Sequence, residues 1–155
     1  MYYSLYDRLL SQESLTRAFR KVKANNGKPG VDGQTVDDFA HDLTGEIIML
    51  VRELREKSYR PQPVKRVTIP KDGGGVRELG IPTVRDRVVQ QALLEILQPI
   101  FDPGFHPSSY GYRPGHSAHQ AIAKAELFIR KYNLRHVVDM DLSRCFDTLN
   151  HELIL

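Results

Sequence analysis

Two aspartates near the end of the sequence have the residue type and spacing that metal chemistry needs. Asp139 and Asp141 alternate with apolar residues within 136–142, and alternate residues of a β-strand point to the same face. Two carboxylates held side by side are costly unless a cation offsets their charge. A divalent ion such as Mg²⁺ prefers such oxygen ligands and completes its shell with substrate phosphates. The pair is compatible with a metal site, but these residues alone favour a structural interpretation, in which Asp141 caps the next turn while Asp139 pairs with a basic residue.

Positive charge is concentrated in one stretch of the chain. Residues 60–90 hold seven Lys or Arg against three acidic residues, a net +4, whereas the whole chain carries +3 and the remainder therefore −1. A local excess of this kind is typical of phosphate-binding surfaces, although a solvated basic face is the commoner explanation for a single charge run. The glycines at 73–75 lie inside this stretch and allow a turn to approach a ligand closely.

Helices are predicted on both sides of the basic stretch. Ser11 can cap a helix through Val22, and Thr35 begins a capping-box pattern before a long amphipathic helix to about Lys57, with Gly45 in its middle. Thr83 and Asp86 form a further capping box, before a helix that Pro99 closes. Ser117 caps the next amphipathic helix.

Strands are predicted at two places. Alternating residues around the glycines predict a β-hairpin near 64–80 with a flexible basic tip, and 136–142 predicts a strand that carries both aspartates. Helices with one hairpin and one late strand indicate an α+β domain. The 155 residues suffice for one ordinary domain. No apolar run is long enough for a membrane span, no signal peptide is visible, and Cys145 is the lone cysteine, so we expect a cytoplasmic protein.

Four blocks of the sequence resemble, in order, those of bacterial group II intron-type reverse transcriptases. They read LTRAFRKVKANNGKPGVDGQTVDDF, IPKDGGGVRELGIPTVRDRVVQQAL, FHPSSYGYRPGHSAHQAI and VVDMDLSRCFDTLNHELI. The resemblance implies the fingers and partial palm of a right-hand polymerase. Residues 1–34 would be an N-terminal extension, 35–135 the fingers, and 136–155 the start of the palm.

The resemblance also implies roles for single residues. Asp141 would bind the catalytic Mg²⁺ or Mn²⁺ ions of a two-metal nucleotidyl transfer, with the backbone carbonyl of Leu142 as a further ligand. Phe146 would select deoxynucleotides by excluding a 2′-hydroxyl, with a plain core phenylalanine as the alternative. Lys71 and Arg77 would bind the triphosphate of the nucleotide, Arg77 in a bidentate manner; an ordinary exposed turn is the alternative for this tip.

The remaining site residues implied by the resemblance are basic. Arg113 would contact the nucleotide. Contacts to template or intron RNA are assigned to Lys21, Lys23, Lys28 and Arg66. The expected partners are an intron RNA template, a DNA primer and deoxynucleoside triphosphates, with no membrane and with association to the nucleoid during work on DNA.

The tyrosine-x-aspartate-aspartate motif that supplies the second carboxylates of this family does not occur in the sequence. We therefore expect a chain truncated before that motif, which belongs by family to the RNA-directed DNA polymerases and is inactive alone. The alternatives are a non-catalytic module that binds intron RNA as maturases do, the product of a decayed element, and a nucleotide-sugar transferase that uses the two aspartates to hold a metal.

Overall fold

The computed structural model describes residues 4–142, 145–150 and 152. The chain divides into two compact units, Met1–Phe105 and His106–Leu155. None of the helices within the described ranges combines the length and the apolar character of a membrane span.

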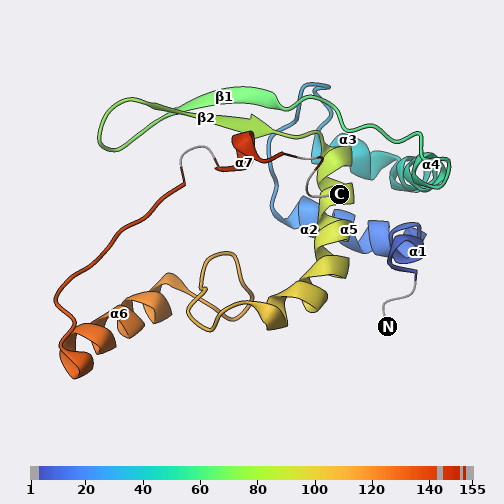
Figure 1. Cartoon of the computed structure of the whole chain (residues 1–155). Helices are drawn as coiled ribbons and strands as arrows, with labels where there is room; N and C mark the ends of the chain where they lie inside the picture. Colours follow the sequence, from blue (N-terminus) through green and yellow to red (C-terminus); the bar gives the residue numbers. More distant parts are fainter. Residues whose placement is uncertain (1–3, 143–144, 151, 153–155) are drawn as a thin grey trace. The chain divides into compact units, whose positions relative to one another are not determined.

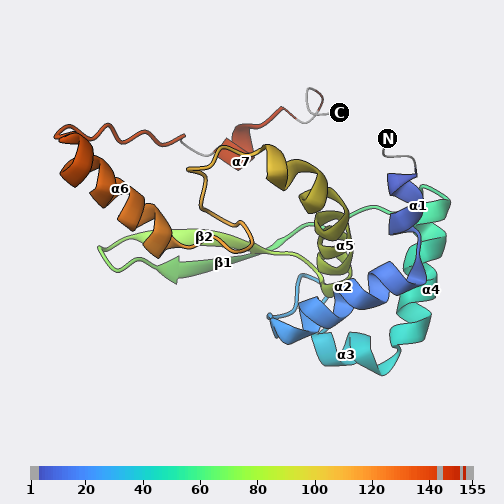
Figure 2. The ribbon, with the colours of Figure 1, turned by 90° about the horizontal axis from the view of Figure 1, so that it is seen from below.

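In the described part of the first unit, α-helices form a cluster from which one hairpin extends (Figure 1). The helices are α1 (Leu5–Leu9), α2 (Gln12–Ala24), α3 (Val36–His41), α4 (Leu43–Arg55) and α5 (Val84–Phe101). In Figure 2, α1 to α5 gather at one end of this unit, with α2 crossing α5. The core includes Leu15, Phe39, Leu50 and Val88, each fully buried. Full burial of one such side chain contributes about 1.5–3 kcal/mol, so the helical cluster is the stable part of this unit.

The predicted helix starts at Ser11 and Thr35 are confirmed, but the predicted long helix to Lys57 is wrong. It is divided at Asp42, which ends α3 and caps α4 by accepting a hydrogen bond from the Gly45 backbone N–H at 3.2 Å. An aspartate side chain competes with the helix for backbone donors, which favours a cap over a continuous helix. The break lets α3 bring Phe39 against Phe19 of α2, with ring centroids 5.0 Å apart.

The predicted end of the helix at Pro99 is also wrong, because Pro99 lies inside α5 and the helix continues to Phe101. An interior proline lacks an N–H donor and its ring crowds the preceding turn, but Pro99 lies in the last turn of α5, where few helical hydrogen bonds remain to be lost. A short 3₁₀-helix, η1 (Asp102–Gly104), follows at once.

The predicted hairpin is present as two antiparallel strands, β1 (Lys65–Pro70) and β2 (Val76–Ile81). Figure 1 shows this hairpin extending away from the helices of its unit. Every strand residue is exposed except Val67, Leu79 and Ile81, which are half-buried. The hairpin therefore joins the helical cluster mainly through the segments at its base.

The second unit contains α6 (Ala118–Tyr132) and α7 (Cys145–Thr148). Ser117 caps α6, as predicted, and Gln120 completes a capping box with it. The predicted strand over 136–142 is not formed, and these residues have no regular structure. A strand needs a hydrogen-bonding neighbour, and the only paired strands among the described residues are β1 and β2. Helices with a two-stranded sheet are compatible with the predicted α+β class.

Candidate active site

The hairpin brings together two of the predicted nucleotide-binding residues. In its register Ile69 lies opposite Arg77 and Val67 opposite Leu79, so these four side chains share one face. At the tip the backbone N–H of Lys71 donates to the Gly75 carbonyl at 3.1 Å. Gly75 has φ of 85°, in the left-handed region that glycine adopts without strain. This bond continues the pairing of the two strands to Lys71, two residues after Ile69 on the face that carries Arg77.

A hollow of about 380 Å³ lies on this face of the hairpin. Its lining includes Lys71, Arg77 and Asp72, with apolar walls from Ile69, Pro70 and Leu79. Two cations beside one hollow offer several N–H donors to phosphate oxygens. Asp72 lowers the net charge of these three side chains to +1, which still attracts a phosphate anion.

The predicted metal ligands lie in the irregular segment of the second unit. Asp139, Asp141 and Leu142 are all exposed, and without a strand their placement on one face does not follow. No group of three or more His, Cys, Asp or Glu side chains that could hold a metal occurs among the described residues. The two carboxylates have the oxygen chemistry that Mg²⁺ prefers, but they do not fill its six positions. Substrate phosphates and further ligands would have to complete the shell.

The remaining predicted nucleotide contacts also lie in the second unit. Arg113 donates to the carbonyls of His106 and Ser109, at 3.2 and 2.9 Å, and so holds its own loop together. Phe146 belongs to α7. The nucleotide contacts of both residues stay predictions.

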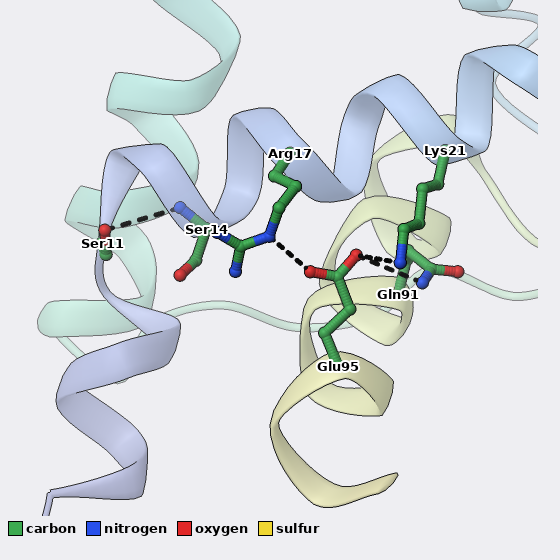
Figure 3. A network of polar contacts seen from close by, with 6 residues as sticks. All are labelled: Ser11, Ser14, Arg17, Lys21, Gln91 and Glu95. Atoms are coloured by element: carbon green, nitrogen blue, oxygen red, sulfur yellow. Dashed lines mark hydrogen bonds and ion pairs between the residues drawn. The ribbon is translucent and has the colours of Figure 1, made fainter. Parts of the chain in front are cut away.

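Two of the lysines predicted to bind RNA already have acidic partners in the first unit. Lys21 lies 3.1 Å from Glu95 of α5, which also accepts from Arg17 at 2.7 Å (Figure 3). Lys23 lies 3.4 Å from Asp37. An RNA phosphate would have to compete with these carboxylates for both lysines.

The other predicted RNA contacts are differently placed. Lys28 supplies its backbone carbonyl to the Arg87 guanidinium at 3.0 Å. Burial lowers the pKa of Arg87, and the negative charge of Asp32, which acts to raise it, only partly offsets this effect. Arg66 lies on β1 opposite Gly80 and is exposed. The RNA contacts of Lys28 and Arg66 stay predictions.

A polar cluster at the base of the hairpin was not recognised as a unit from the sequence. The buried Asp86 carboxylate accepts hydrogen bonds from the Tyr59 hydroxyl at 2.5 Å and from the Thr83 hydroxyl at 2.7 Å. Burial, together with the hydrogen bond to Asp86, raises the pKa of Tyr59, so its hydroxyl remains a donor. The capping pattern at Thr83 predicted the hydrogen bond from the Asp86 backbone N–H to the Thr83 hydroxyl oxygen, but neither of these contacts of the carboxylate. Nothing local indicated Tyr59, which lies 27 residues before Asp86.

Comparison with protein families gives a match over more than half of the chain. Residues 69–155 match the family described as reverse transcriptase (RNA-dependent DNA polymerase). The match begins inside β1 and includes Lys71, Arg77, Arg113 and Asp141.

Curated proteins match almost the whole chain. It is 41% identical over 154 residues to Protein YkfC of Escherichia coli K12, with 96% of this chain and 40% of that protein covered. It is 31% identical over 151 residues to an uncharacterised 91 kDa protein in a cob intron of Schizosaccharomyces pombe, with 96% of this chain and 18% of that protein covered. It is 32% identical over 155 residues to the group II intron-encoded protein LtrA of Lactococcus lactis, with 97% of this chain and 25% of that protein covered.

The chain thus spans 40% or less of the length of these relatives. The family match extends from the basic hairpin to the aspartates, which are the two regions where the sequence predicted chemistry. From this match we conclude that the chain belongs to the reverse transcriptase (RNA-dependent DNA polymerase) family.

Proposed function

We propose that the chain is the N-terminal part of an RNA-directed DNA polymerase of a group II intron-like mobile element. The family match over residues 69–155 carries this proposal, and the similarity to a group II intron-encoded protein supports the intron-like origin. Its template would be intron RNA, its primer DNA, and its substrates deoxynucleoside triphosphates.

In this proposal the hairpin belongs to the fingers and binds the nucleotide's triphosphate. Arg77 would hold phosphate oxygens through paired N–H donors, while Lys71 would add a mobile point charge at the tip. Their shared position at one hollow supports the assignment. Residues 35–135 would form the fingers, after an extension over 1–34.

Residues 136–155 would begin the palm, with Asp141 as the metal-binding carboxylate. The Mg²⁺ or Mn²⁺ ions would activate the primer hydroxyl and stabilise the leaving pyrophosphate when bound. Asp141 and the Leu142 carbonyl would hold these ions. Phe146 would exclude a nucleotide sugar that carries a 2′-hydroxyl, and Arg113 would contact the nucleotide. The segment over 136–142 would become a strand only when a neighbouring strand pairs with it, which is the physical condition for a rigid aspartate.

The triphosphate contact is tested by equilibrium binding of Mg²⁺–dGTP to this chain. We expect Arg77→Ala to weaken binding about tenfold or more, because hydrogen bonds to charged groups are worth about 1.5–3 kcal/mol. Arg52→Ala is the matched control, since Arg52 is a surface arginine of α4 paired with Glu56. Equal affinity of wild type and Arg77→Ala would contradict the assignment.

A filter-binding assay with intron RNA separates the proposal from its alternative. Tight RNA binding that tolerates Asp141→Ala, combined with no binding of Mg²⁺–dGTP, would favour a non-catalytic RNA-binding module. This chain alone is expected to give no primer extension; in a longer protein that also carries the second carboxylates, Mg²⁺-dependent primer extension that Asp141→Ala abolishes would establish the polymerase reaction itself.

A further inference from the structure

The two ends of the hairpin meet at one buried carboxylate. Asp86, only 3% exposed, lies in the first turn of α5. Its Oδ1 accepts the Tyr59 hydroxyl at 2.5 Å, and its Oδ2 accepts the Gln62 backbone N–H at 3.2 Å and the Thr83 hydroxyl at 2.7 Å. Tyr59 and Gln62 precede β1, whereas Thr83 follows β2. A single side chain therefore ties the incoming and the outgoing segment to the same helix.

Capping of α5 does not account for these contacts. The cap is made by the Thr83 hydroxyl oxygen, which accepts the Asp86 backbone N–H at 3.1 Å. The carboxylate is thus left to bind the segments of the hairpin base. A buried carboxylate is costly unless hydrogen bonds compensate it, and here three donors do so.

The base controls the tip because the hairpin has little other support. Its strands are exposed apart from three half-buried residues, and Figure 2 shows them leading away from α2, α4 and α5. Six strand residues span about 20 Å, so a tilt of about 10° at the base moves the tip by about 3.5 Å. Displacements of this size are large compared with the reach of a hydrogen bond.

We propose that Asp86 and Tyr59 are positioning residues that fix the direction of the hairpin, and with it the reach of Lys71 and Arg77 toward a triphosphate. The inference rests on the proposed function for its ligand. The anchoring of the hairpin itself rests only on the contacts of Asp86. Neither residue lines the hollow at the tip, so their effect on a ligand there is transmitted by the hairpin.

The test compares two variants that each remove one tyrosine hydroxyl. Tyr59→Phe breaks a bond to Asp86, whereas the control Tyr6→Phe breaks the bond from Tyr6 of α1 to the Leu54 carbonyl of α4, away from the hairpin. Hydrogen exchange of residues 65–81, followed by mass spectrometry, reports the anchor. We expect exchange about fivefold faster in Tyr59→Phe and unchanged in Tyr6→Phe, the factor expected for one net hydrogen bond.

The affinity of the same proteins for Mg²⁺–dGTP shows whether anchoring of the hairpin affects triphosphate binding. We expect Tyr59→Phe to weaken binding about fivefold and Tyr6→Phe to leave it unchanged. Asp86→Asn should have at least the effect of Tyr59→Phe on both readouts, because it removes the charge and one of the two acceptor oxygens.

The two readouts separate failure of the inference from failure of the proposed function. Unchanged hairpin exchange in both Tyr59→Phe and Asp86→Asn overturns the anchor, whatever the wild type binds. Faster hairpin exchange with no binding of Mg²⁺–dGTP by the wild type supports the anchor and overturns the triphosphate site. Equal effects of Tyr6→Phe and Tyr59→Phe on the hairpin would show a general loss of stability and also overturn the anchor.

Discussion

At the scale of the residue, Glu95 is where burial and charge oppose each other most directly. Its side chain is only 13% exposed, and it faces two cations that are about half exposed, Arg17 and Lys21 (Figure 3). Burial raises the pKa of Glu95, but the hydrogen bonds and charges of the two cations outweigh it, so the pKa lies below its ordinary value of 4.5. The carboxylate thus joins α2 to α5 as an anion.

We expect Glu95→Gln to lower the free energy of unfolding by about 1 kcal/mol at pH 7, discounted for the exposure of both cations. Because the folded pKa is the lower one, this contribution is complete above pH 4.5 and is lost as pH falls through the folded pKa. Urea unfolding of wild type and variant over this range measures the difference, which should shrink toward zero in acid.

Glu56→Gln is the control for this prediction. Glu56 pairs with Arg52 on the surface of α4, with the two side chains 56% and 75% exposed. Such a pair contributes about 0.3–0.5 kcal/mol at most. A loss as large as that of Glu95→Gln, or a difference independent of pH, would contradict the account of Glu95.

At the scale of the element, the loop between α2 and α3 is shaped by a close approach to the start of α5. Gly30 is buried, and a Cβ there would lie 2.7 Å from the Thr83 Cα and 2.8 Å from its backbone N. Backbone atoms at a helix start cannot yield as a flexible side chain can. The absence of a side chain at Gly30 is therefore what allows the loop to pack there.

We expect Gly30→Ala to destabilise the protein by about 1–3 kcal/mol, the usual cost of forcing extra atoms into a packed site. Gly104→Ala is the matched control, since a Cβ at Gly104 meets nothing within 4 Å. Thermal unfolding of both variants measures the difference. Similar melting temperatures for the two would show that the loop can move away from Thr83 at little cost.

At the scale of the whole molecule, the fully buried side chains that the structure describes lie in the first unit. Among the residues whose burial the structure describes, every buried hydrophobic side chain lies between Leu9 and Ile96. In the second unit α6 has no buried residue, and Val137, Val138 and Met140 are each more than three-quarters exposed. Apolar burial is the main favourable term in folding, so the first unit should carry the stability of the chain.

Residues 1–105 alone should therefore fold cooperatively. We expect a melting temperature within about 5 °C of that of the whole chain, since a larger shift would correspond to roughly 1 kcal/mol in a domain of this size. Circular dichroism melts of both proteins measure this. Residues 1–83, which lack α5 and its buried Val84, Val88 and Ala92, should show no cooperative transition. A large loss of stability in 1–105 would mean that the second unit supports the first.

The sequence alone determined the features that depend on neighbouring residues. The caps at Ser11, Thr35, Thr83 and Ser117 and the hairpin around three glycines were all predictable, because a cap spans three residues and a strand pair joined by a turn is local. The blocks that resemble group II intron-type reverse transcriptases gave the family. The site roles drawn from them, Asp141 among them, stay proposals.

Only the tertiary structure decided which distant side chains meet. Glu95 contacts Arg17, 78 residues away in the sequence, and Asp86 contacts Tyr59, 27 residues away. No periodic pattern in the sequence indicates contacts between residues so far apart in the chain. Strand formation over 136–142 has the same dependence, since local alternation predicts a strand but pairing requires a neighbour. Propensity and capping act over a few residues, whereas burial and pairing depend on the fold that the whole chain reaches.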